Sequence, residues 1–188
     1  MSKSFVHLHA HTEYSMLDGA AKIQTYIDRV KELAQPAAAI TDHGNLYGAL
    51  EFYNIAKKNG VKPIIGYEAY ITTESRFERP DRDKNKRFHL TLLAENNEGY
   101  WNLVSLASKA FTDGYYYKPR LDYELLREHS KGVIALSGCL GGEIAQHLAP
   151  DGSVEEGNNQ GERSYQKALD KAVLYQNIFG EENFYIEL

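Results

Sequence analysis

Three histidines, His7, His9 and His11, alternate near the start of the chain. On an extended strand, alternate side chains project from one face with neighbours roughly 6–7 Å apart, so two adjacent imidazoles can reach one metal ion. A lone histidine is more often a hydrogen-bonded core residue than a ligand, but three at this spacing reverse that preference. The pattern favours a metal site built on this segment.

Further side chains that bind metals recur near the ends of the predicted strands. They are Asp18, which follows the first strand, His43 after the second, Glu68 in the third, His89 at the start of the fourth and Cys139 after the fifth. In α/β sheets, functional groups gather at the carboxyl ends of strands and in the loops that follow them. Nitrogen, oxygen and sulfur donors together suit zinc or manganese better than calcium. We therefore expect these residues to converge on a cluster of divalent metal ions.

The elements that would position these residues alternate between short apolar runs and amphipathic stretches, which predicts parallel strands joined by helical crossovers in an α/β fold. The predicted strands span residues 5–11, 37–42, 63–71, 89–94, 133–137 and 183–188. Helical spacing predicts crossover helices that face the sheet through Ile23, Ile27, Val30 and Leu33, through Leu46, Leu50 and Tyr53, and through Tyr165, Leu169, Ala172 and Val173. Segments 74–87 and 150–161 are charged or glycine-rich and predict exposed loops.

Composition sets broad limits on the kind of protein. With 188 residues, 43% of them hydrophobic, the chain can bury one substantial core, and we expect a single domain. The net charge of −5 argues against a broad basic surface for nucleic acid, although bound dications would reverse the sign inside a pocket. The one cysteine excludes an intramolecular disulfide and fits a reducing compartment. No apolar run in the sequence is typical of a membrane span or a signal peptide, so we expect a cytoplasmic protein without membrane contact.

The ordered motifs resemble those of the polymerase and histidinol phosphatase (PHP) family. They are His9-Ala10-His11-Thr12, Thr41-Asp42-His43-Gly44, Gly66-x-Glu68, His89 and Cys139. Finer motifs at residues 14–19, 96–100, 114–120 and 136–139 resemble the PHP domain at the amino terminus of bacterial replicative DNA polymerases, the DNA polymerase III alpha subunits. The resemblance spans essentially the whole chain.

Membership of this family implies a PHP-type distorted (β/α)7 barrel with up to three divalent metals, zinc or manganese or both, at the carboxyl ends of its strands. It implies one ion held by His9, His11 and Glu68, a second by Asp18 and His43, and a third by Glu68, His89 and Cys139. Glu68, His11 and His43 would be the catalytic residues. The family takes further ligands from an Asp-x-His motif on its last strand, and this sequence stops before such a motif appears. We therefore expect residues 1–188 to be one PHP domain cut short at its carboxyl-terminal end, and the natural chain to continue past Leu188.

The function implied by the resemblance is metal-dependent hydrolysis of phosphodiester bonds, as a 3′–5′ exonuclease that proofreads primer ends during DNA replication. Its partners would be DNA, the remaining domains of a longer polymerase chain and other replisome subunits. Two alternatives stay open. One is a non-catalytic, metal-stabilised scaffold that binds the polymerase body or a proofreading subunit. The other is a free-standing phosphatase of the histidinol phosphatase type, which would share the metal site but not the polymerase-like motifs.

A few cationic and aromatic residues are candidates for DNA contacts, namely Arg87, Tyr116, Lys118 and Arg120. Aromatic rings beside cations can stack on unpaired bases, but packing against other polymerase domains explains them equally well. The cations of segment 74–87 alternate with acidic residues, which favours a solvated loop over a DNA contact. We expect His129, at a predicted helix end, and His147 to be structural.

Overall fold

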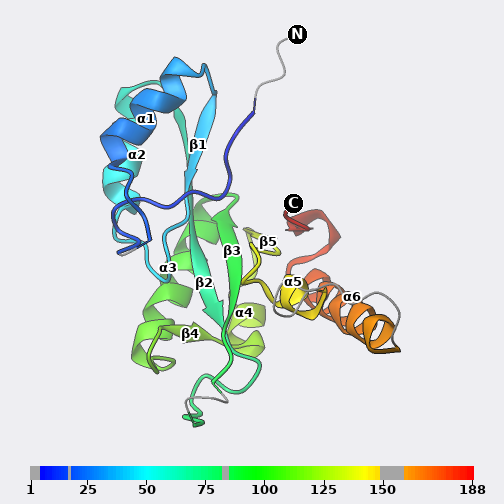
Figure 1. Ribbon diagram of the computed structural model, residues 1–188. Helices are drawn as coiled ribbons and strands as arrows, with labels where there is room; N and C mark the ends of the chain where they lie inside the picture. Colours follow the sequence, from blue (N-terminus) through cyan, green and yellow to red (C-terminus); the bar gives the residue numbers. More distant parts are fainter. Residues whose placement is uncertain (1–4, 17, 82–84, 149–158) are drawn as a thin grey trace.

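A computed structural model describes residues 5–16, 18–81, 85–148 and 159–188, and within them the predicted α/β class is confirmed (Figure 1). One mixed sheet follows the order β1-β2-β3-β5-β6, with β4 paired to β2 beside this path. The strands are β1 (Ala37–Ile40), β2 (Lys62–Ile71), β3 (Phe88–Ala94), β4 (Arg120–Leu121), β5 (Val133–Leu136) and β6 (Phe184–Tyr185). The helices are α1 (Ile23–Glu32), α2 (Ala49–Lys58), α3 (Asn97–Thr112), α4 (Tyr123–Glu128), α5 (Glu143–Leu148) and α6 (Asn159–Phe179), and the 3₁₀ turn η3 (Glu181–Asn183) precedes β6.

The direction of β3 decides where a site can form. β1 and β4 run parallel to β2, and β6 runs parallel to β5, whereas β3 is antiparallel to both of its neighbours, β2 and β5. The prediction of parallel strands is therefore wrong for β3. Because β3 is reversed, its first residues lie beside the carboxyl end of β2, where His89 pairs with Tyr70.

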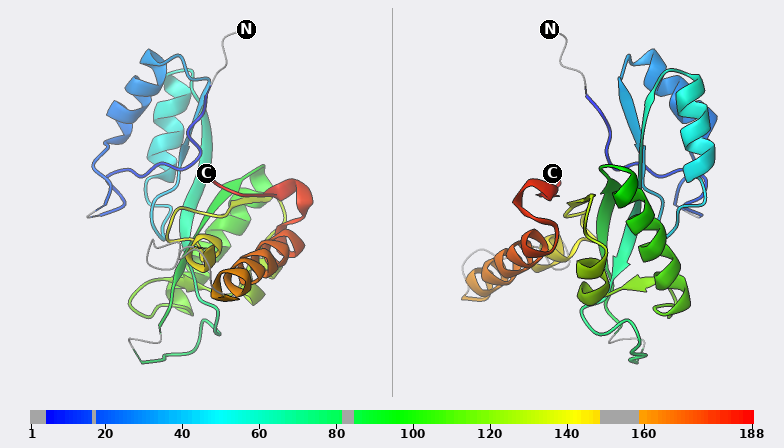
Figure 2. Two further views of the ribbon diagram at one scale, coloured as in Figure 1. Left: turned by 45° about the vertical axis from the view of Figure 1, so that its right-hand side comes forward. Right: turned by 180° about the vertical axis from the view of Figure 1, so that it is seen from behind.

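Two apolar cores hold the helices against the sheet. The larger lies between β2, β3, β5 and helices α3, α4 and α6, and includes Leu90, Leu92 and Leu103. The smaller lies between β1, α1 and α2. Figures 1 and 2 show α1 and α2 beside β1 on one side of the molecule, and α5 and α6 on the other side, beyond β5. Each fully buried leucine contributes roughly 1.5–3 kcal/mol, so the sheet is a firm base for the residues at its edge.

Side-chain caps fix the two helices that follow β3 and β4. Asn96 accepts a hydrogen bond from Gly99 N (3.1 Å) at the start of α3, and Asp122 accepts one from Leu125 N (3.0 Å) at the start of α4. Caps of this kind contribute about 0.5–2 kcal/mol each. A Cβ on Gly99 would lie 1.6 Å from the carbonyl oxygen of Gly132, so only glycine lets α3 approach the start of β5 this closely.

Three helices occur where apolar spacing predicts them, but two of them turn a different face to the core. In α2, Leu50 and Tyr53 are exposed, and the buried face carries Phe52 and Ala56 instead. In α6 the predicted inward residues Tyr165, Leu169 and Val173 are exposed, and Ala168, Tyr175, Ile178 and Phe179 are buried. The predicted faces are wrong because exposed aromatic and aliphatic side chains have the same spacing as buried ones.

The predicted loops and the last strand agree with the structure in part. The described residues of segment 74–87 form no helix or strand. Of segment 150–161, residues 150–158 lie outside the described part of the chain, and α6 already begins at Asn159. The predicted strand at 183–188 shortens to β6. No helix within the described residues is both long and apolar enough to cross a membrane.

Candidate metal centre

Residues 5–16 cross the sheet without forming a strand (Figure 1), so the predicted strand at 5–11 is wrong. Ala10 N donates a hydrogen bond to the Thr41 hydroxyl (2.7 Å). In a β-ladder, this backbone N–H would donate to a backbone carbonyl instead. Backbone bonds from Ala39 N to His7 O (3.3 Å) and from Thr41 N to Ala10 O (2.9 Å) hold the segment beside β1. His7 is exposed and packs edge-on against Phe5.

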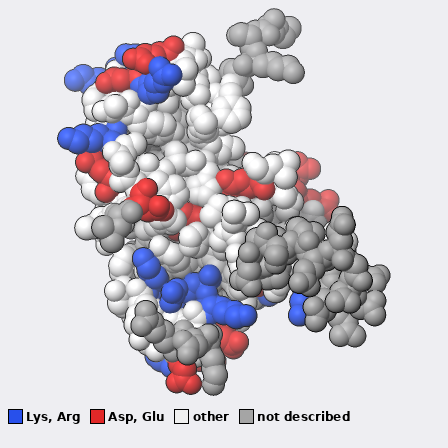
Figure 3. Space-filling view, viewed as in Figure 1, with Lys and Arg blue, Asp and Glu red and all other residues white. Residues whose placement is uncertain are grey.

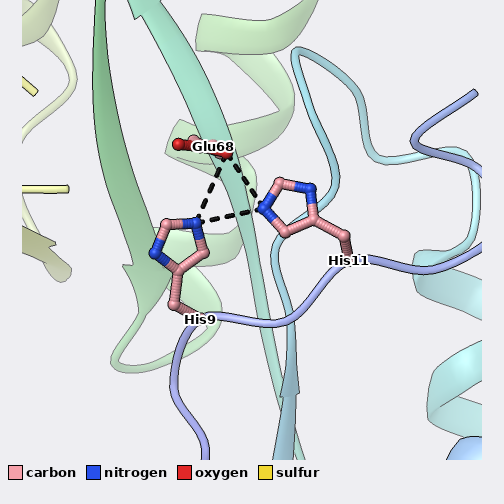
Figure 4. Close-up of side chains that lie close together, drawn as sticks. All are labelled: His9, His11 and Glu68. Atoms are coloured by element: carbon pink, nitrogen blue, oxygen red, sulfur yellow. Dashed lines mark hydrogen bonds and ion pairs between the residues drawn. The ribbon is translucent and has the colours of Figure 1, made fainter. Parts of the chain in front are cut away.

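Glu68 on β2 lies at the centre of the site, and its side chain is 1% exposed. Its Oε2 lies 3.4 Å from His9 Nε2 and 3.0 Å from His11 Nε2, the triangle drawn in Figure 4. The same oxygen lies 2.8 Å from His43 Nδ1, and Oε1 lies 2.8 Å from His89 Nδ1. One buried carboxylate thus meets four imidazoles that come from three separate parts of the chain.

All the ligand positions predicted from the sequence lie around one open pocket of about 370 Å³. Its lining residues are His9, His11, Asp18, His43, Glu68, His89, Cys139 and Glu187. Three sets of donor atoms within it are close enough to hold an ion, and they are His9, His11 and Glu68, then His11, Asp18 and His43, then His43, Glu68 and His89. Neighbouring sets share a residue, so ions bound in them would be close together.

Cys139 lies at the edge of the third set. Its Sγ is 3.8 Å from Glu68 Oε1 and 3.9 Å from His89 Nδ1. Gly138, with φ +80°, makes the turn that brings the thiol there, and a Cβ on it would lie 2.9 Å from the His89 carbonyl oxygen. The reversed β3 and this turn after β5 together bring a thiol and an imidazole to the same edge of the sheet.

The spacing of these atoms fits a metal ion. The donor atoms of His9 and His11 are 3.1 Å apart, and each lies 3.0–3.4 Å from the Glu68 oxygen. Ligands about 2.0–2.1 Å from a tetrahedral zinc ion are roughly 3.3 Å from one another. In addition, Glu68 Oε2 and His43 Nδ1 are buried and form no hydrogen bond of good geometry. Buried polar atoms of this kind need a partner, and an ion would supply it.

The charges around Glu68 strongly favour its ionised form. Burial alone would raise the pKa of Glu68, but the close approach of His11, His43 and the other two imidazoles holds this pKa well below its ordinary value. Burial opposes protonation of His9, yet Glu187 and Glu68 outweigh it and raise the pKa of His9 to about 9. The carboxylates therefore attract positive charge to this pocket, whether protons or metal cations.

Ser15 fixes which nitrogen of His11 faces the pocket. Its hydroxyl donates its single hydrogen bond to Asp42 Oδ1 (2.6 Å), because a carboxylate can only accept. Ser15 Oγ must then accept from both His43 N (3.0 Å) and His11 Nδ1 (3.2 Å). His11 therefore carries its proton on Nδ1 and turns the lone pair of Nε2 towards Glu68.

Glu187 is part of the pocket but was not predicted from the sequence. Its Oε1 accepts a hydrogen bond from His9 Nδ1 (2.7 Å), and its backbone N donates to Ser137 Oγ (2.9 Å). Its position near the end of the last predicted strand could have identified it, because the other predicted ligands also lie near strand ends. A hydrogen bond of this kind orients an imidazole and raises its basicity as a ligand.

The four DNA-contact candidates differ in exposure. Arg120 is fully buried and donates to the carbonyl oxygens of Gly114 (3.0 Å) and Arg76 (3.0 Å), among others, so its prediction as a DNA contact is wrong. Tyr116 is half-buried and donates to Pro80 O (2.9 Å). Only Arg87 and Lys118 of the four have exposed side chains.

The helix-end and loop residues have structural roles. His129 ends α4, as predicted, and His147 lies in α5 with its ring against Phe88. Arg76 in the 74–87 segment is buried, and its guanidinium donates to Asp122 Oδ1 (2.9 Å). This segment is therefore anchored to the cap of α4 rather than fully solvated.

Comparisons with known proteins agree with the motifs. The family described as "PHP domain" matches residues 7–188. A DNA polymerase III subunit alpha from Helicobacter pylori strain J99 is 49% identical over 187 residues, which is 100% of this chain and 15% of that protein. The DNA polymerase III subunit alpha of Thermus aquaticus is 59% identical over 154 residues, 78% of this chain and 12% of that protein. The chain thus spans about 15% or less of the length of these curated relatives.

Proposed function

The chain belongs to the PHP domain family, and we propose that its histidine- and carboxylate-lined pocket binds divalent metal ions and hydrolyses phosphodiester bonds. We further propose that the bonds are those at the 3′ end of DNA, which makes the domain a 3′–5′ exonuclease that proofreads during replication. The observation that carries the proposal is Glu68, a buried carboxylate that faces four imidazole nitrogens within 3.4 Å.

Each side chain has a definable task in this reaction. Divalent ions bound here would stabilise the negative charge on phosphoryl oxygens and activate a water molecule as nucleophile. Glu68 belongs to both the first and the third donor set and would hold an ion in each. His11 presents Nε2 because Ser15 holds its other nitrogen protonated, and His9 presents Nε2 because Glu187 accepts from its Nδ1. His43 lies between Asp18 and Glu68 and links the second set to the third.

The donor atoms favour zinc, manganese or both. Imidazole nitrogens dominate the three sets, carboxylate oxygens complete them, and the Cys139 thiol lies beside the third. Such mixtures suit zinc and manganese, whereas calcium takes six to eight oxygen ligands. We propose up to three ions in the complete domain, with Glu68, His11 and His43 as the residues on which catalysis depends.

The names of the relatives suggest the wider setting. We propose that the chain is a PHP domain of a longer replicative polymerase in the cytoplasm, that DNA is its substrate, and that other polymerase domains and replisome subunits are its partners. The identity to the polymerase subunits of Helicobacter pylori and Thermus aquaticus supports this proposal. It also favours the polymerase setting over a free-standing small-molecule phosphatase.

Glu68→Ala tests the catalytic proposal. It removes the oxygens that serve two donor sets, so bound metal, measured by elemental analysis, should fall together with digestion of 3′-labelled DNA. The loss should exceed the roughly 10–100-fold typical of residues that only orient a ligand. His129→Ala is the control, because His129 at the end of α4 contacts Asn102 (3.2 Å), and neither residue is among the described residues that line the pocket. A Glu68→Ala protein that digests DNA at the parental rate after metal repletion would exclude catalysis here and favour the metal-stabilised scaffold.

A further inference from the structure

A second, larger cleft of about 930 Å³ opens beside the metal centre. It shares Asp18, His43 and His89 with the candidate donor sets, so a molecule in it would touch the metal ligands. Away from the centre, Tyr47 and Phe111 are among its lining residues. Nothing in the proposed hydrolysis accounts for these rings.

The rings form an exposed row that leads away from the centre. Tyr47 and Phe111 have centroids 6.3 Å apart, and Phe111 stacks on Tyr115 at 6.1 Å with 17° between the planes. These three side chains are 67%, 39% and 53% exposed. Exposed aromatic rings in a row are a recurrent platform for unpaired bases, because every base has a π-face to stack.

One exposed cation, Lys118, also lines the cleft. Lys118 Nζ lies 5.2 Å from the ring centroid of Tyr70, and that ring stacks on His43 at 6.0 Å. One aromatic ring thus separates Lys118 from a candidate metal ligand. Arg87 is exposed two residues before His89, and among the described residues no carboxylate pairs with Arg87 or Lys118. Figure 3 shows Lys and Arg side chains gathered below the acidic groups at the middle of the molecule.

Besides the candidate ligand Asp18, the cleft has two acidic lining residues among those that the structure describes. These are Glu13 and Glu51, and Glu51 accepts a hydrogen bond from the Tyr14 hydroxyl (2.8 Å). Phosphate groups would be repelled by Glu13 and Glu51 and attracted by Lys118. A phosphate backbone would therefore lie beside Tyr70 and Lys118.

We propose that this cleft binds the unpaired end of a polynucleotide: Tyr47, Phe111 and Tyr115 stack its bases, and Lys118 and Arg87 hold its phosphates. The inference rests on the proposed function and names the substrate end that the same centre would cleave. A mononucleotide has one base and would leave most of the aromatic row uncovered. Lys118, which pairs with no carboxylate of the described residues, lies one ring away from the proposed phosphoester-cleaving centre, and a cation there suits a phosphate better than a protein surface.

The test is the binding of a fluorescent oligo(dT) with phosphorothioate linkages, which resist cleavage, to the 188-residue chain. Fluorescence anisotropy at several salt concentrations gives the affinity and its salt slope. Tyr47→Ala should weaken binding about 5- to 150-fold, the range for loss of one stacked base. Lys118→Ala should lower the salt slope by about 0.7, the value for one phosphate contact of a single strand.

Two matched variants serve as controls. Tyr53→Ala removes an exposed tyrosine of α2 outside the cleft, and Lys131→Ala removes an exposed cation that pairs with Glu98 (3.1 Å) before β5. Both should keep the parental affinity and salt slope. Parental affinity and salt slope in Tyr47→Ala and Lys118→Ala would overturn the inference. The aromatic row would then be better explained as a binding surface for a protein partner or a mononucleotide.

Hydrolysis of bis(p-nitrophenyl) phosphate by the unaltered chain separates this inference from the proposed function. If the chain binds oligo(dT) through Tyr47 and Lys118 but does not cleave the small diester, the subsite stands and the hydrolytic proposal fails. If it cleaves the small diester but binds oligo(dT) no better than the variants, the hydrolytic proposal stands and the subsite is refuted.

Discussion

Replacing Ser15 by alanine should weaken metal binding although Ser15 is not itself a proposed ligand. Ser15 is 2% exposed, and its hydroxyl connects Asp42, His43 N and His11 Nδ1. Without it, nothing in this contact set holds the proton of His11 on Nδ1. A proton that moves to Nε2 occupies the lone pair that faces Glu68, so the tautomer able to bind an ion becomes less populated.

The size of the effect follows from these hydrogen bonds. Loss of the bond that selects the tautomer should lower metal affinity about 10–100-fold, as for other residues that orient a ligating histidine. The His43 backbone N–H also loses its acceptor, and one unpaired buried donor costs roughly 1–3 kcal/mol. For a chain of 188 residues that destabilisation lowers Tm by about 2–12 °C. Affinity must therefore be measured well below the Tm of the variant.

Isothermal titration with Zn²⁺ and Mn²⁺ measures the affinity, and long-range ¹H–¹⁵N spectra of the histidine rings report the tautomer of His11. Ser130→Ala is the matched control, because its hydroxyl makes only a long bond to Arg127 O (3.4 Å) at the end of α4. Parental metal affinity in Ser15→Ala, with His11 still protonated on Nδ1, would refute the reasoning that the hydroxyl selects the tautomer.

Two further predictions concern residues whose roles the structure defines. Glu187→Gln removes one of the two carboxylates that together raise the pKa of His9 to about 9, so this pKa should fall in an NMR titration of metal-free protein. Metal binding at pH 7.5 should then release fewer protons, seen as a smaller buffer dependence of the titration enthalpy. An unchanged His9 titration would contradict this prediction. Arg120→Ala should destabilise the fold by roughly 3–5 kcal/mol, because it leaves a void and unpaired carbonyls. Tm, measured by thermal unfolding, should fall by about 6–20 °C. Weaker oligo(dT) binding at unchanged Tm would instead restore Arg120 as a DNA contact.

The pocket was predictable from residue types because its chemistry is concentrated in rare side chains at recognisable places. His43 and Glu68 lie near the carboxyl ends of β1 and β2, where an α/β fold gathers functional groups. The direction of β3 was not predictable, because a short, mostly apolar strand has the same pattern in either direction. His89 reaches the pocket only because β3 is reversed.

The supporting residues were harder to find because their roles arise from contacts between distant segments. Ser15 and Asp42 are common residue types, and the contact between them joins positions 27 residues apart. Glu187 lies 178 residues from the imidazole that it orients. No local pattern in a sequence indicates such pairs. A single sequence therefore predicts the ligands, but not the residues that orient them through hydrogen bonds.

The segment that carries His9 and His11 shows why those aiming groups matter. It has no strand of its own, and its backbone bonds to β1 are few. Asp42 compensates from beneath, since its buried carboxylate accepts from Thr12 N (2.6 Å), Thr12 Oγ1 (2.7 Å) and Ser15 Oγ (2.6 Å). Hydrogen bonds to a charged acceptor are worth roughly 1.5–3 kcal/mol each, comparable to several ladder bonds. The motif Thr41-Asp42-His43-Gly44 thus contributes twice, because His43 faces the pocket while Thr41 and Asp42 hold the segment that brings the other two imidazoles over Glu68.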